Sequence, residues 1–125
     1  MEKNPVCFWE LASHNAEASV NFLKNVFDWD IESDEKLGIY RVPAGQSASS
    51  FNGGGIFTLK RAKLPFLTVY IRVDDIDSKV KLVEKHGGFI VDPPSELPDG
   101  SRICLFNEPS GVTFAMIQRK SPNID

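Results

Sequence analysis

Hydrophobic positions in this chain recur at a spacing of sixty residues. The stretch from Phe8 to Asn15 and the helix-like run after it align without a gap on the stretch from Thr68 to Asp75 and its following run. The aligned apolar pairs are Leu11 and Ile71, Val20 and Val80, Phe22 and Leu82, Leu23 and Val83, Trp29 and Phe89, and Ile31 and Val91. This pairing predicts two copies of one structural unit. Because two curved sheets set edge to edge enclose a concave surface, we expect a small-molecule site where the copies meet.

Each copy is predicted to contain a strand, a helix and three further strands. Asn15 and Asp75 are typical N-caps, and Gly87-Gly88 is expected to end the second helix. The predicted first-copy elements are a strand from Cys7 to Ser13, a helix from Ala16 to about Phe27, and strands at Trp29–Glu32, Leu37–Val42 and Gly55–Leu59. The later strands of the second copy are predicted at Gly88–Val91, Ser101–Phe106 and Thr113–Gln118.

Helical spacing of apolar residues predicts which side of each helix is buried. The expected buried stripes are Ala16, Val20, Leu23 and Phe27 in the first copy and Ile76, Val80 and Val83 in the second. Turns are expected at Asp34-Glu35-Lys36, Pro93-Pro94, Pro98-Asp99-Gly100 and Pro109-Ser110-Gly111. Residues Arg61 to Pro65 are expected to link the copies. The loop from Ala44 to Gly54 is equally consistent with a lid over a cavity and with a tolerated surface insertion.

Composition narrows the possible partners. The chain has 125 residues, is 42% hydrophobic and has a net charge of −3, so one domain with its own core is expected. No basic run is dense enough to follow a nucleic-acid backbone, and no apolar stretch has the length of a membrane span. We therefore expect no nucleic-acid or membrane partner and a cytoplasmic location. Cys7 and Cys104 lie in strand-like sequence without a CxxC partner, which favours buried, reduced thiols.

Two motifs resemble one known family. The run Asn15-Ala16-Glu17-Ala18-Ser19-Val20-Asn21-Phe22-Leu23 is similar to D-x-x-x-S-x-x-F-Y, and Phe106-Asn107-Glu108-Pro109-Ser110-Gly111 is similar to F-x-D-P-x-G. Both patterns belong to the vicinal oxygen chelate superfamily, the group of glyoxalase I, bleomycin-resistance proteins and extradiol dioxygenases. The resemblance implies an α+β fold in which two βαβββ modules, at about residues 5–60 and 65–119 of a single domain at 1–125, form a curved, cavity-enclosing mixed sheet with the helices outside.

The resemblance also implies where a divalent metal would bind. The family's usual His, Gln or Glu positions correspond here to Phe8, Thr68 and Ala115, and the matching inner strand of the first copy offers Phe57. A phenyl ring or a methyl group has no lone pair for a metal, and an isolated hydroxyl is a poor ligand. His14 and His86 lack the spacing of a shared chelate and are expected to be exposed or capping residues. No metal and no other cofactor are predicted.

Strand alternation suggests which side chains line the expected cavity. If Leu11 and Ile71 lie under the helices together with Trp9 and Val69, their neighbours point to the concave side. The predicted ligand-binding residues are Phe8, Glu10, Phe57, Thr68, Tyr70, Arg72 and Ala115, with Arg41 and Leu59 as further candidates. Glu10 is a candidate catalytic base, but a structural ion pair with Arg72 or a place at the wet rim is the favoured interpretation of its position.

Three functions remain open at this stage. The first is a metal-free protein that binds a small, partly apolar organic molecule, as resistance-type members of the family sequester drugs. The second is a lyase, isomerase or dioxygenase relative that uses Glu10 as a base or within an atypical metal site. The third is a structural or regulatory module whose pocket is filled by side chains such as Phe8 and Phe57. Resemblance alone also implies a homodimer.

Overall fold

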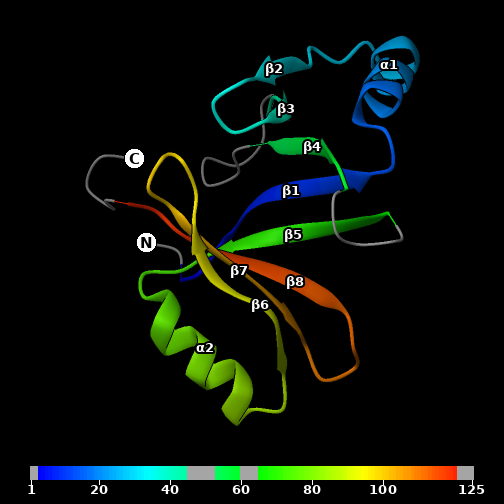
Figure 1. Cartoon of the computed structure of the whole chain (residues 1–125). Helices are drawn as coiled ribbons and strands as arrows, with labels where there is room; N and C mark the ends of the chain where they lie inside the picture. The colour runs from blue at the N-terminus through cyan, green and yellow to red at the C-terminus, as the bar shows by residue number, and fades with distance from the viewer. Residues whose placement is uncertain (1–2, 45–52, 60–64, 121–125) are drawn as a thin grey trace. The chain divides into compact units, whose positions relative to one another are not determined.

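The computed structural model describes residues 3–44, 53–59 and 65–120 (Figure 1). These residues form β1 (Val6–Ser13), α1 (Ala16–Phe27), β2 (Glu32–Asp34), β3 (Ile39–Val42), β4 (Gly54–Thr58), β5 (Phe66–Arg72), α2 (Ile76–Lys85), β6 (Phe89–Glu96), β7 (Arg102–Asn107) and β8 (Thr113–Gln118). The order β-α-β-β-β therefore occurs twice, and the predicted α+β class is confirmed. Neither helix in the described part of the chain is long and apolar enough to cross a membrane.

The chain divides into two compact units. The first unit is Cys7–Thr68, and the second begins at Val69 and includes the segment that precedes Cys7. Strand order in the first unit is β2-β3-β4-β1, and in the second it is β6-β7-β8-β5. In each unit the first and last strands pair in parallel, and the other neighbours pair antiparallel. The same local topology is thus built from both halves of the sequence.

Each helix covers one face of the sheet in its own unit. In the first unit Ala16 and Val20 of α1 form a buried cluster with Ile56 of β4. In the second unit Ile76 of α2 packs in the same way with Met116 of β8. Leu23, Val80 and Val83 are half-buried against these clusters, as the helical spacing predicts. We call the opposite side of each sheet its helix-free face.

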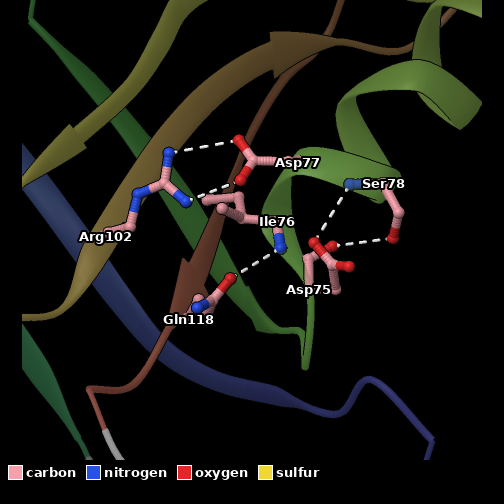
Figure 2. Close-up of polar contacts among 6 residues, drawn as sticks. All are labelled: Asp75, Ile76, Asp77, Ser78, Arg102 and Gln118. Carbon is pink, nitrogen blue, oxygen red and sulfur yellow. Dashed lines mark hydrogen bonds and ion pairs between the residues drawn. The ribbon is translucent and has the colours of Figure 1, made fainter.

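Matching hydrogen bonds fix the start of both helices. Asn15 accepts a hydrogen bond at Oδ1 from the amide of Ala18 (3.1 Å), and Asp75 caps α2 in the same way. The amides of Ala16 and Ile76 donate to side chains 42 residues further along: Thr58 Oγ1 and Gln118 Oε1, both at 2.8 Å. Figure 2 shows this arrangement for α2. The first amides of both helices, which have no partner within the helix, are therefore bonded to nearby side chains.

Three predictions about the first unit are wrong in detail. Phe27 is exposed rather than buried, and its ring is tilted against that of Trp29 with a ring-centroid distance of 5.7 Å. The strand predicted at Trp29–Glu32 begins only at Glu32, since the preceding residues pack rather than pair: Trp29 contacts Trp9, and Ile31 is buried. The strand predicted from Leu37 begins at Ile39, after a turn closed by the hydrogen bond from the Gly38 amide to the Asp34 carbonyl.

In the second unit the turn predicted at Pro93-Pro94 lies inside β6. This strand is at the edge of its sheet, where a residue without an N–H group is tolerated. Its register with β7 shifts on both sides of Asp92, which accommodates the two prolines. The predicted turns at Pro98–Gly100 and Pro109–Gly111 are present. The linker at 61–64 and most of the loop predicted from Ala44 to Gly54 lie outside the described residues.

Candidate functional site

Two adjacent glycines of β4 distinguish the two faces of the sheet in the first unit. A methyl group added at Gly54 would lie 2.0 Å from the indole of Trp9, which packs on the helix side. A methyl group added at Gly55 would instead lie 3.1 Å from the ring of Phe8 and 3.0 Å from Ile39. Phe8 therefore lies on the helix-free face, and alternation along β1 places Glu10 there as well. These positions agree with the faces predicted from the sequence.

Charged residues form a row across the helix-free face of the first unit. Strand register aligns Glu32 with Arg41, Arg41 with Gly55, and Gly55 with Glu10. Tyr40 and Val42, which flank Arg41 in β3, pack in the helix-side cluster, so Arg41 points to the other face. Since Gly55 has no side chain, the row has no side chain of its own between Arg41 and Glu10, and the ends of Phe8 and Ile39 lie over Gly55 instead.

Arg41 is oriented by Asp34. Its Nε donates to Asp34 Oδ2 at 2.7 Å, and Asp34 Oδ1 accepts from the amide of Leu37 at 3.1 Å. The hydrogen bond from Arg41 is the main reason that the pKa of Asp34 lies below its ordinary value. This bond uses one of the five N–H donors of the Arg41 guanidinium.

The helix-free face of the second unit is mostly apolar. Register aligns Tyr70 with Ala115 and Ala115 with Leu105, and it aligns Arg72 with Ile117. Tyr70 and Ala115 are buried, whereas Arg72 is half-buried. This face thus combines aliphatic side chains with one phenol and one guanidinium, a mixture typical of surfaces that recognise organic molecules.

The residues at the family's metal positions do not fit a divalent ion. Phe8 and Ala115 offer only hydrocarbon, Phe57 is a second phenyl ring, and Thr68 is a buried hydroxyl. Across residues 3–44, 53–59 and 65–120, no three side chains from His, Cys, Asp and Glu form a group that could hold a metal ion. No step of chemistry is therefore assigned to a metal here.

Strand register refines the comparison between the two units. Glu10 pairs with Gly55, and Tyr70 pairs with Ala115. Tyr70 comes sixty residues after Glu10, and Ala115 comes sixty residues after Gly55. The first-unit counterpart of Ala115 is therefore Gly55, while Phe57 corresponds to Ile117. Gly55 was missing from the residues proposed from the sequence, although the sixty-residue spacing alone could have found it.

The two cysteines are buried and the two histidines are exposed. Cys7 and Cys104 are buried free thiols, and burial is the main cause that raises the pKa of Cys104, with Asp92 as a second cause. A raised pKa lowers the thiolate fraction and with it the reactivity. His14 and His86 are both exposed, and His86 forms the C-cap of α2, as the sequence analysis expects.

The fold and the side chains of the helix-free faces define a class of small βαβββ proteins in which these faces combine apolar side chains with a few polar groups. The chain belongs to the Glyoxalase/Bleomycin resistance protein/Dioxygenase superfamily, whose family model matches residues 8–116. This membership confirms the resemblance found in the sequence.

Curated relatives are longer than this chain. Putative glyoxylase CFP32 of Mycobacterium bovis is 24% identical over 119 residues, covering 87% of this chain and 43% of that protein. Anthracycline biosynthesis protein DnrV of Streptomyces peucetius is 26% identical over 129 residues, covering 87% of this chain and 45% of that protein. The chain therefore spans less than half the length of these relatives.

Solved structures share the fold at low sequence identity. A variant of methylmalonyl-CoA epimerase from Streptomyces coelicolor, in complex with 2-nitronate-propionyl-CoA, has a TM-score of 0.64 at 14% identity, with 96% of this chain and 100% of that chain covered. A hypothetical protein of Bacillus halodurans has a TM-score of 0.63 at 13% identity, with 96% and 97% covered. At this identity the likeness shows the fold alone.

Proposed function

We propose that this chain binds a small, partly apolar organic molecule on the helix-free faces of its sheets, without a divalent metal ion. The observation that carries the proposal is the chemistry of those faces. Family membership supports small-molecule binding, yet Phe8, Gly55 and Ala115 stand where metal ligands would be needed. Recognition then depends on apolar contact and on a few polar groups.

Four polar groups are proposed to contact the ligand. Glu10 and Arg41 contribute opposite charges across Gly55, and Tyr70 and Arg72 contribute a phenol and a guanidinium. Arginine suits a carboxylate or phosphate because its donors match two oxygens at once. The bound esters of coenzyme A in epimerase neighbours carry such groups, and methylmalonyl-CoA is therefore a reasonable first compound to test.

A thermal shift screen of small organic compounds tests this proposal. A ligand present at about one hundred times its dissociation constant stabilises a fold by about 2.7 kcal/mol, which for a chain of this size raises Tm by roughly 10 °C. Tyr70→Phe and Glu10→Gln should reduce the shift. Glu17→Gln, an exposed change on α1, is the matched control and should leave the shift intact. Equal shifts in all variants would refute the assignment of these residues.

One observation favours a structural module as the second candidate. The ring of Phe8 and the side chain of Ile39 close over Gly55, so this part of the face is filled by the protein itself. If the module has no ligand, no library compound should shift Tm in the native chain. Under the binding proposal, a hit should be found and should bind differently after Phe8→Ala, which opens that space.

Two further expectations belong to the same proposal. The chain acts in the cytoplasm, and it does so as a homodimer. Sequence composition supports the first, and resemblance to the family supports the second. Fractionation of cells that express the protein tests the location, and sedimentation of the purified protein tests the homodimer.

A further inference from the structure

The C-terminal end of α1 carries an exposed apolar patch. Phe22, Val26, Phe27 and Trp29, which we call the α1 patch, are exposed by 61%, 56%, 55% and 38%. The patch is anchored to the core, because the rings of Phe27 and Trp29 are in tilted contact and the centroid of the Trp29 ring lies 6.3 Å from that of Trp9, which packs against the core cluster. Four large apolar side chains gathered on one small surface are more than scattered exposure explains and mark an interaction site.

Two acidic residues lie next to the α1 patch in the sequence. Asp28 and Asp30 flank Trp29 and are both exposed, and Lys24 is the basic residue of the helix. Between positions 18 and 31 the chain has one lysine and two aspartates, a net charge of −1. A partner surface should therefore be apolar at its centre and basic around it.

The same chain offers such a surface on α2. Lys81, Leu82 and Lys85 lie on one outward stripe of the helix, and Leu82 is 44% exposed. The equivalent window, 78 to 91, has three lysines and one glutamate, a net charge of +2. Lysine stems add apolar area beside the leucine while their ammonium groups stay at the rim.

Asp77, one turn before Lys81 on α2, is held in an ion pair. Asp77 accepts two hydrogen bonds from Arg102, at 2.8 and 3.1 Å, so its carboxylate is directed to β7 (Figure 2). The outer stripe of α2, which we call the α2 stripe, is thus basic as well as partly apolar. The two equivalent windows, 18–31 and 78–91, therefore carry opposite net charge.

We propose that the α1 patch of one copy docks on the α2 stripe of a second copy. Charge complementarity identifies the partner as a second copy: two α1 patches, each next to a net negative charge, would repel each other, whereas the α2 stripe has the opposite net charge and an exposed leucine. This contact is independent of any small-molecule ligand.

Sedimentation equilibrium of the full chain, without ligand, tests the contact. The native chain should show an average mass that rises above 13.9 kDa with concentration. Phe22→Gln should lower the association constant by about tenfold or more, since an aromatic residue at the centre of an interface carries much of its affinity. A Tm of the Phe22→Gln variant equal to that of the native chain would show that this exposed substitution leaves the fold intact.

Charge reversal identifies the partner surface. Asp30→Lys and Lys81→Glu should each weaken self-association by about threefold to tenfold, and an equal mixture of the two variants should recover it. Glu35→Lys and Lys36→Glu, exposed changes in the turn between β2 and β3, are the matched controls. A monomer at all concentrations, association insensitive to Phe22→Gln, or a mixture that does not recover would each overturn the proposal.

Discussion

At the scale of single residues, Gly54 and Gly55 hold β4 between two aromatic rings. Gly54→Ala forces a methyl group into the indole of Trp9, which is packed in the core and cannot move freely. We expect this change to lower the free energy of unfolding by about 2 to 3 kcal/mol. Gly55→Ala meets only the ends of the Phe8 and Ile39 side chains and should cost clearly less. Urea unfolding of both variants provides the measurement, and equal losses would contradict this view of the two faces.

Two surface carboxylates make stability depend on pH. The pKa of Asp77 is lowered mainly by its hydrogen bond with Arg102, and that of Glu108 mainly by Ser110. A carboxyl whose pKa is lower in the folded state stabilises the fold above its unfolded pKa, near 3.8 for Asp and 4.5 for Glu. That stabilisation is lost as the pH falls through the lower, folded value.

The expected result is a fall in unfolding free energy on acidification below about pH 4. Asp77→Asn and Glu108→Gln should each make this fall shallower, because one fewer carboxyl then takes up a proton on unfolding in acid. Chemical denaturation at a series of pH values measures the slope. A slope that is the same in both variants as in the native chain would show that these contacts do not persist in solution.

At the scale of elements, equivalent clamps hold the two helices to their sheets. Asn15→Ala or Asp75→Ala removes the oxygen that accepts from the third helical amide and should cost about 1 kcal/mol each. Asn21→Ala, an exposed change within α1, is the control and should be neutral or slightly stabilising. Thermal unfolding would reveal the difference, and a cap variant as stable as the control would argue against the clamp.

Sequence pattern predicted the helices better than the strands. Both N-caps and the buried stripes up to Leu23 follow from local spacing, and α1 begins and ends where expected. β2 and β6 differ from prediction because pairing decides them: Trp29 and Ile31 pack instead of pairing, and Pro93 is tolerated at a sheet edge. Such tertiary effects have no local signature.

At the scale of the whole molecule, the family and the α+β class could be predicted from motif order and from the sixty-residue spacing. The faces of Phe8 and Glu10 also followed from strand alternation. The role of Gly55 was missed: the sixty-residue spacing makes it the counterpart of Ala115, but its place opposite Glu10 comes from the strand register. The ion pair of Arg41 with Asp34 was missed for the same reason, since it joins two strands across a turn.

Binding of an organic ligand without a metal ion is the central claim, and the dissociation constant of a screening hit before and after chelation tests it most directly. Titration calorimetry on protein as purified and on protein treated with a strong chelator should give the same constant, because Phe8, Gly55 and Ala115 supply no metal ligand. Loss of binding after chelation, with recovery on adding back a stoichiometric divalent cation, would contradict the account.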